Sequence, residues 1–336
     1  MTSSNPEIPI LDVENLSVSF AQAHRRLSVL DEISFTLSRG KILGIVGESG
    51  SGKSVTALAI AGLLSEQGRI DRGHIRLAGR DLASLPRDEK RRVRGSELAM
   101  IFQEPMSSLN PLLPVGFQIA EGLIEHRGIG RRQAQLRAIE LMTKVGIADP
   151  ERRARSYPHQ LSGGMRQRAM IAIAIACQPK LLLADEPTTA LDVTIQAQIL
   201  DLLRGLRDAS GMAMILITHD LGVVAEIADR VLVMYAGQIV EEAPIEDLFA
   251  APAHPYTRLL LRSIPSITAK RSSLEAVPGA TPSPAMMPAG CRFHPRCPHA
   301  IDKCRAEGPP LEATIPSRRV RCWRVGEIDT PGSRAG

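Results

Sequence analysis

The chain has 336 residues, of which 44% are hydrophobic, 23% charged and 3% aromatic, and its formal net charge is +5. This composition is typical of a soluble globular protein, and the apolar run at residues 169–177 is far shorter than the roughly 20 residues that cross a bilayer. The first nine residues lack the features of a signal peptide, so the sequence predicts a cytosolic protein. An excess of basic residues can indicate nucleic-acid binding, but this chain has few aromatic rings for stacking on bases. We therefore expect the basic residues to lie on solvated faces of helices.

The first predicted elements are short strands in which apolar and polar residues alternate, as in an antiparallel sheet: residues 10–13, 16–20 and 33–37. Residues 42–46 are continuously apolar, which predicts a buried parallel strand. This strand leads into a glycine-rich stretch, a predicted helix at 55–64 and a further strand at 73–77.

Residues 115–156 contain no convincing strand, and their apolar residues recur at helical spacing, which predicts a helical insertion. Helices and buried strands then alternate at 163–176, 180–185, 194–209 and 213–218, and this alternation predicts a parallel α/β core. Proline, serine and alanine are enriched before residue 290, so we interpret residues 251–290 as a linker to a cysteine-rich segment at 291–323.

The glycine-rich stretch at residues 47–54 fits the phosphate-binding P-loop pattern between a strand and a helix. Its glycines let backbone N–H groups wrap phosphate oxygens, and the helix N-terminus adds positive dipole. Lys53 would contact the β- and γ-phosphates, and the Ser54 hydroxyl would ligate Mg²⁺. The predicted ATP contacts here are Gly47, Glu48, Ser49, Gly50, Ser51, Gly52, Lys53, Ser54 and Val55.

A second nucleotide motif is the apolar strand that ends in Asp185 and Glu186. Asp185 would hold Mg²⁺ beside the P-loop, directly or through water. Glu186 is then placed to polarise the attacking water, a task suited to a carboxylate whose pKa is raised in a closed site.

With the P-loop, the Asp-Glu strand and the octapeptide at residues 161–168 in this order, residues 8–250 resemble the ATPase domain of ATP-binding cassette (ABC) proteins. The resemblance implies an α/β P-loop (RecA-like) core with an antiparallel β subdomain and a helical subdomain at about 104–160. The octapeptide resembles the ABC signature, which binds the ATP held by a second cassette. The octapeptide could also be a simple helix N-cap formed by Ser162. Two glycines early in a helix lower its stability, however, which is unexpected if capping is the only role of this stretch.

Further site residues follow from this resemblance. Gln103 matches the glutamine that senses γ-phosphate and Mg²⁺ where a membrane subunit docks, and His219 matches the switch histidine on the γ-phosphate. Phe20 is either the aromatic residue that stacks on adenine or a residue of the sheet core. The residues implied to contact ATP in the partner cassette are Ser162, Gly163, Gly164, Gln167 and Asp192, the last in the 190–192 loop.

Stretches at 44–54, 100–111, 254–257 and 290–297 resemble the cassettes of dipeptide, oligopeptide and nickel importers. This resemblance implies ATP hydrolysis that powers uptake of peptides or related solutes from the cytoplasmic face of the membrane. It also implies a second cassette, two permease subunits and a solute-binding protein as partners. Nickel import and a non-transport ABC ATPase acting on nucleic acid are the alternatives.

Four of the five cysteines fall in the last segment: Cys291, Cys297, Cys304 and Cys322. A reducing compartment argues against disulfides, and four thiolates would suit a 4Fe–4S cluster or Zn²⁺. The wide spacing favours iron–sulfur, as in some relatives of this importer family. We therefore expect a small C-terminal metal-binding segment, with His294 and His299 as candidate replacement ligands.

Overall fold

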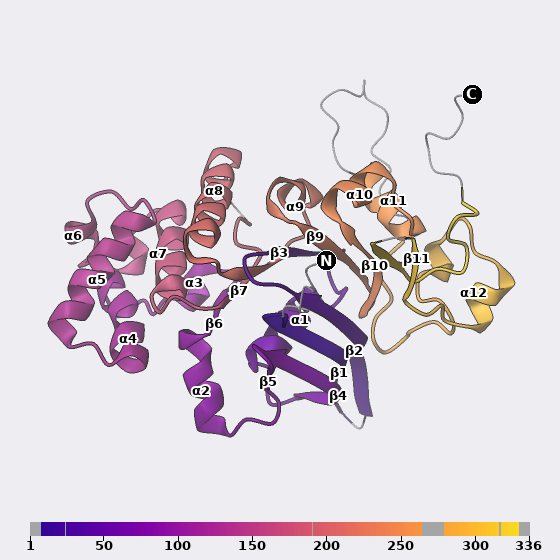
Figure 1. Ribbon diagram of the computed structural model, residues 1–336, viewed down its shortest axis with the longest axis horizontal. Coiled ribbons are helices and arrows are strands. Elements are labelled where there is room, and N and C mark those ends of the chain that lie inside the picture. Colours follow the sequence, from indigo (N-terminus) through magenta and orange to yellow (C-terminus); the bar gives the residue numbers. More distant parts are fainter. Residues whose placement is uncertain (1–7, 24, 190, 264–278, 316, 329–336) are drawn as a thin grey trace, which may run out of the picture.

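The fold is seen in a computed structural model that describes residues 8–23, 25–189, 191–263, 279–315 and 317–328. These residues form a four-stranded antiparallel sheet and an eight-stranded mixed sheet. The mixed sheet lies between a layer that contains α8, α9 and α11 and a layer formed by α1 and the antiparallel sheet (Figure 1). Each layer buries its own apolar cluster against one face of the mixed sheet.

The antiparallel sheet has the order β2-β1-β4-β5, with β1 at Leu11–Gln22, β2 at Arg25–Leu37, β4 at Gly68–Leu77 and β5 at Arg80–Asp81. The runs predicted as separate short strands join into longer ones because the register shifts within β1, at bulges that interrupt the alternation of apolar and polar residues. At Gly73 the backbone has φ 92°, and a Cβ there would lie 2.4 Å from the Glu14 carbonyl oxygen, so this bulge requires glycine.

The centre of the mixed sheet is parallel, in the order β9-β3-β8-β7-β6. Every residue of β3, β7 and β8 is buried, which explains their continuous apolar sequences. Parallel strands end at one edge of the sheet, so the segments that follow them converge there. The bounds are β3 Ile42–Val46, β6 Leu98–Ile101, β7 Leu181–Asp185, β8 Ala213–Ile217 and β9 Arg230–Tyr235.

Helices connect and cover these strands, and the predicted insertion is a separate group of helices at one end of the molecule (Figure 1). The insertion contains α3 Pro105–Ser108, α4 Val115–Arg127, α5 Arg131–Lys144, α6 Pro150–Arg153 and the 3-10 turn η1 Pro158–Gln160. The remaining helices up to residue 227 are α1 Lys53–Ala61, α2 Arg87–Ser96, α7 Gly163–Ile175, α8 Val193–Ser210 and α9 Leu221–Ile227.

The end of the chain folds against the mixed sheet. β12 pairs with β10 and β11 pairs with β12, so strands far apart in sequence extend the same sheet. The predicted linker contains α11, and its residues 264–278 lie outside the described residues. The elements are β10 Gln238–Pro244, α10 Ile245–Ala250, α11 Pro255–Arg262, η2 His294–Arg296, α12 Asp302–Ala306, β11 Glu312–Ile315 and β12 Arg318–Val320.

Phe293 anchors this last part of the chain. Its side chain is buried, and its ring centroid lies 5.2 Å from that of Tyr235 and 5.4 Å from that of Tyr256. Aromatic pairs at these distances pack favourably beyond the area that they bury. The cysteine-rich segment is therefore continuous with the core.

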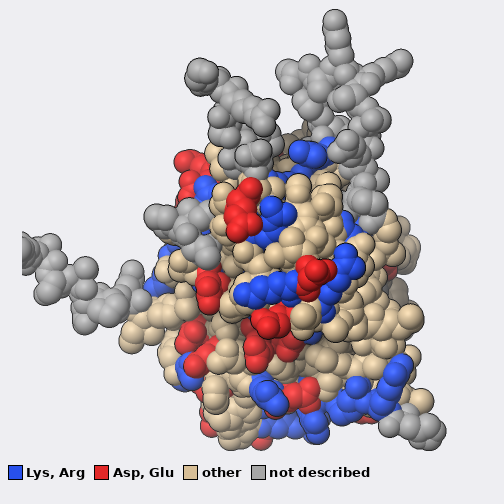
Figure 2. Space-filling view, turned by 90° about the vertical axis from the view of Figure 1, so that its right-hand side faces the viewer, with Lys and Arg blue, Asp and Glu red and all other residues tan. Residues whose placement is uncertain are grey.

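Two further observations concern membrane-spanning helices and surface charge. Within the described ranges, no helix combines the length and apolar character needed to cross a bilayer. Figure 2 shows the face at the right-hand side of Figure 1, where basic and acidic side chains of the described residues are interspersed.

Candidate functional site

The P-loop leaves the buried strand β3 and enters α1 in a backbone conformation that requires glycine. Gly47 has φ 150°, and a Cβ at this position would lie 2.2 Å from the Met234 carbonyl oxygen. Gly52 has φ 103° and caps α1. The loop therefore curls tightly against β9, and the N-terminus of α1 faces the space that it encloses.

Lys53 is held inside this curl. Its Nζ atom donates hydrogen bonds to the carbonyl oxygens of Gly47 at 2.7 Å and Glu48 at 2.9 Å. Burial lowers the pKa of Lys53, while the nearby carboxylates of Glu186, Asp185 and Glu48 act in the opposite direction. The ammonium group is thus partly desolvated and stands where the P-loop would receive phosphate oxygens.

Ser54 and Asp185 bring two oxygen ligands together from distant parts of the chain. The Ser54 hydroxyl donates to Asp185 Oδ1 at 3.2 Å. Burial raises the pKa of Asp185, and the bond from Ser54 partly counteracts this effect. A hydroxyl and a carboxylate side by side are the donors that Mg²⁺ prefers, so this pair fits the ion that a nucleotide site needs.

Glu186 lies at the centre of a polar cluster. Its carboxylate accepts hydrogen bonds from Gln103 Nε2 at 3.0 Å and Thr189 Oγ1 at 2.8 Å, and it lies 3.2 Å from His219 Nδ1. Burial raises the pKa of Glu186, but the contacts with Thr189 and His219 outweigh this effect and leave the pKa below its usual value. In the single chain the carboxylate is therefore ionised at neutral pH, in contrast to the raised pKa expected for the closed site.

Thr189 was not identified from the sequence, because no pattern distinguishes it from the neighbouring Thr188. The structure thus brings Ser54 to Asp185, and Gln103 and His219 to Glu186, and it adds Thr189 as a further donor. Glu186 has φ 48°, an uncommon backbone conformation for a glutamate. Such strained residues cluster at active sites.

The signature residues lie at the start of α7. Ser162 is exposed, and its side chain caps the helix by accepting a hydrogen bond from the Met165 N–H at 3.3 Å. Gly164 lies against the start of α8, where an added Cβ would be 3.2 Å from an Ile195 methyl group. Among the described residues, no hydrogen bond or ion pair joins Ser162, Gly163 or Gly164 to the P-loop.

Three other predicted contacts differ in accessibility. Asp192 is exposed and caps α8 by accepting from the Ile195 N–H at 2.9 Å, while Ala190 lies outside the described residues. Gln167 is only 3% exposed, and its Nε2 atom has no hydrogen-bond partner. Phe20 is half-buried on β1, with its ring against Gly68. Gln167 would therefore need to move before it could contact a ligand.

The prediction of a C-terminal metal-binding segment is wrong. Cys291, Cys297, Cys304 and Cys322 border one small cavity, yet across the described residues no three or more Cys, His, Asp or Glu side chains form a group able to hold a metal ion. Burial raises the pKa of the Cys291 and Cys322 thiols, and that of Cys297 to about 11. Neither the predicted 4Fe–4S cluster nor the Zn²⁺ alternative is supported.

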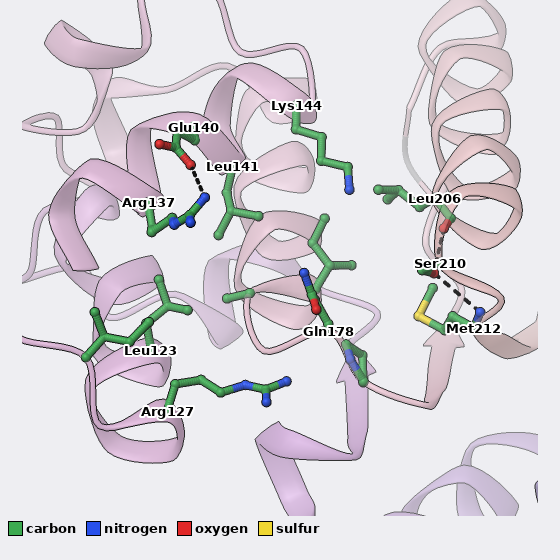
Figure 3. Close-up of a pocket in the computed structure, with 14 residues that line it drawn as sticks. Leu123, Arg127, Arg137, Glu140, Leu141, Lys144, Gln178, Leu206, Ser210 and Met212 are labelled. Carbon is green, nitrogen blue, oxygen red and sulfur yellow. Dashed lines mark hydrogen bonds and ion pairs between the residues drawn. The ribbon is translucent and has the colours of Figure 1, made fainter. Parts of the chain in front are cut away.

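A cavity of about 550 Å³ lies between the helical insertion and the ends of α7 and α8 (Figure 3). Leu123, Arg127 and Lys144 are among its lining residues, and none of the sequence-predicted site residues lines it. Arg127 already donates to the Cys177 carbonyl oxygen, and Arg137 on the same wall pairs with Glu140 at 2.7 Å. The cavity is separate from the phosphate-binding edge of the sheet.

Comparisons with known proteins agree with this geometry. The family described as ABC transporter matches residues 30–189, and the family described as oligopeptide/dipeptide transporter, C-terminal region, matches residues 240–304. A dimeric structure of the ATP-binding cassette MJ0796 in a post-hydrolysis state, bound to ADP and Pi, superposes with a TM-score of 0.64. It is 28% identical and covers 70% of this chain and 98% of that chain, which confirms the predicted cassette fold.

Two bacterial relatives match almost the full length. The oligopeptide transport ATP-binding protein AppD of Bacillus subtilis (strain 168) is 51% identical over 95% of this chain and 97% of its own length. The dipeptide transport ATP-binding protein DppD of Escherichia coli (strain K12) is 50% identical over 93% of this chain and 96% of its own length. The chain therefore belongs to the ATP-binding subunits of the oligopeptide and dipeptide ABC transporter family.

Proposed function

We propose that this chain is the ATP-hydrolysing subunit of an importer for dipeptides or oligopeptides, and that it works as one of two cassettes. The polar cluster around Glu186 carries the proposal, because it lies next to the Ser54–Asp185 pair and the lysine of the P-loop. The substrate class follows the names of AppD and DppD and the matched C-terminal family. These names favour peptides over nickel and over nucleic acid.

The phosphate chain of ATP is expected to bind in the P-loop. Backbone N–H groups of residues 47–55 and the N-terminus of α1 would donate to the phosphate oxygens. Lys53 would exchange its two carbonyl partners for the β- and γ-phosphates. Phe20 is the candidate for stacking on adenine.

Ser54, Asp185 and Gln103 would hold Mg²⁺, which when bound neutralises charge on the β- and γ-phosphates. Glu186 would accept a proton from the attacking water, as an ionised carboxylate can do. His219 would then leave its contact with Glu186 and donate to the γ-phosphate. The reaction is ATP plus water to ADP plus phosphate.

The signature of one cassette is expected to complete the site of the other. Ser162 and Asp192 are exposed, and Gly163 and Gly164 let a phosphate approach the start of α7 closely. ATP would therefore join two cassettes, and its hydrolysis would let them separate. This difference in affinity for the open and closed pair is what can drive a membrane partner.

Exposed apolar side chains in the stretch of chain around and after Gln103 are a candidate docking surface for the permease subunits. Phe102, Met106, Leu112 and Phe117 are exposed, with Leu112 81% exposed. Exposed apolar surface commonly marks protein contacts where it is contiguous. Through this contact the chain would lie at the cytoplasmic face of the membrane, with a solute-binding protein on the other side.

Glu186→Gln tests the proposed chemistry. Glutamine retains the size of the side chain but cannot accept the proton, so ATP turnover should fall by about 100-fold or more. ATP binding should persist, and light scattering should detect an ATP-dependent dimer of the variant. The unchanged chain with ADP is the control. Continued hydrolysis by the variant would exclude Glu186 as the base.

A further inference from the structure

The P-loop is in direct contact with the C-terminal segment, which we define as residues 279–328. Arg296 forms a two-point ion pair with Glu48 of the P-loop, at 2.6 Å from Nη1 to Oε2 and 3.0 Å from Nη2 to Oε1. Thr281 also donates to Glu48 Oε2, at 3.0 Å. The Arg296 side chain is only 6% exposed and that of Glu48 is 27% exposed, so the arginine end of this contact is largely removed from water.

Arg296 is itself held in place from the other side. Its guanidinium donates to the Tyr235 hydroxyl and to the Gly279 carbonyl oxygen, both at 3.3 Å, and its central carbon lies 5.6 Å from the Tyr235 ring centroid. A planar guanidinium fixed in this way presents its two donors to Glu48 in one orientation.

Glu48 transmits this contact to the part of the P-loop that binds Lys53. Its N–H donates to the buried Tyr256 hydroxyl at 2.9 Å, and its carbonyl oxygen accepts from Lys53. Glu48 is thus held by hydrogen bonds at three places: its carboxylate by the C-terminal segment, its N–H by Tyr256 of α11 and its carbonyl oxygen by Lys53.

A loop that is already fixed in its binding conformation loses less conformational entropy when a ligand arrives. We propose that Arg296 is a positioning residue for ATP: through Glu48, the C-terminal segment holds the first turn of the P-loop ready for the phosphates. The inference rests on the proposed ATP-binding function. It assigns the C-terminal segment an effect on nucleotide affinity in place of the metal-binding role that the sequence suggested.

Arg296→Gln and Glu48→Gln, made in the full-length chain, test this role. Each should raise the Kd for a fluorescent ATP analogue by about tenfold, as expected for loss of a buried charge-assisted contact. The double variant should bind no more weakly than either single variant, because both changes remove the same interaction. Arg296→Lys should recover only part of the affinity, since an ammonium cannot make the two-point contact.

The matched control is Arg319→Gln. Arg319 ties the same segment to the core through Glu242 on β10 and the Ser34 carbonyl oxygen, without touching the P-loop. This variant should lose thermal stability but keep its Kd for ATP within about twofold. In the hydrolysis assay, Arg296→Gln should raise KM while kcat changes by less than about twofold.

Two results would overturn the inference. One is Arg296→Gln with wild-type affinity for ATP and a stability loss like that of Arg319→Gln, which would leave the ion pair as a structural tie. The other is additive effects of the Glu48 and Arg296 substitutions on the Kd. Failure of the unchanged chain to bind ATP would instead contradict the proposed function, so the two failures are distinguishable.

Discussion

At the scale of single residues, neighbouring side chains contact both carboxylate oxygens of Glu186 and so fix its orientation. Thr189 and Gln103 donate to Oε2, and His219 contacts Oε1. The His219 side chain is 62% exposed, so it can turn towards a phosphate at little cost in packing. Thr189 lies only three residues after Glu186, so its hydrogen bond to this carboxylate can form without a bound ligand.

Thr189→Val should shift the pH dependence of ATP hydrolysis. Burial raises the pKa of Glu186 and the bonds from Thr189 and His219 lower it, so removing the Thr189 hydroxyl raises the pKa. Glu186 acts in its ionised form, and activity is lost as the pH falls through its pKa. The acidic limb of kcat/KM against pH should therefore move to higher pH.

The control for this shift is Thr194→Val, at an exposed position on α8. It makes the same chemical change close to the site but outside the contacts of Glu186. An acidic limb that stays in place in Thr189→Val, or moves equally in the control, would contradict the role given to Thr189.

At the scale of elements, α11 begins at a fully buried histidine. His254 Nδ1 accepts a hydrogen bond from the Tyr256 N–H at 3.1 Å and so caps the helix that carries Tyr256 to the P-loop. Burial lowers the pKa of His254 to about 3, because a charged imidazole would lose its solvation there. The start of α11 is therefore stable only with a neutral histidine.

His254→Asn should reduce the acid sensitivity of the fold. Unfolded His254 binds a proton near pH 6.5 and folded His254 only near 3, so stability is complete above 6.5 and is lost as the pH falls towards 3. The expected slope is about 1.4 kcal/mol per pH unit from this residue. Asparagine can cap the helix but does not titrate, so urea unfolding at pH 7, 6 and 5 should show a shallower slope.

His159→Asn is the control, because it removes a histidine from an exposed position. Its unfolding free energy should follow the wild-type slope. If His254→Asn also follows that slope, the buried histidine does not determine the acid sensitivity of the fold.

At the scale of the whole molecule, one chain contains two kinds of incomplete site. Among the described residues, no hydrogen bond or ion pair joins the signature residues to the P-loop, and apolar side chains are exposed in the stretch of chain around and after Gln103. The first is consistent with a second cassette that completes the nucleotide site. The second is consistent with membrane subunits that cover the apolar surface.

Leu112→Asp should weaken assembly with co-expressed permease subunits, on the order of tenfold in affinity if Leu112 is a central contact. The side chain is 81% exposed, so the thermal stability of the isolated chain should change little. Co-purification with the permeases is the measurement. Leu136→Asp, 57% exposed on α5, should leave co-purification unchanged; equal recovery of permeases with both variants would rule out this docking surface.

The α/β fold of the cassette and the meeting of Lys53, Asp185 and Glu186 at one edge of the sheet were predictable from the amino-acid sequence. The reason is local: continuous apolar strands, glycines at required backbone positions and a lysine, serine and carboxylate pair occupy short stretches of chain. Because parallel strands end at one edge, locating these strands was enough to predict that Lys53, Asp185 and Glu186 meet.

The role proposed for the C-terminal segment rests on contacts that only the folded chain shows. Spacing predicted metal binding by the four cysteines, but ligand geometry depends on how a loop-rich segment folds, and the described part of the chain forms no group able to hold a metal ion. Glu48 and Arg296 are separated by 248 positions, and no local pattern links them. Their contact exists because the C-terminal segment packs on β9 and β10, where the hydrophobic burial of Phe293 brings Arg296 to the P-loop.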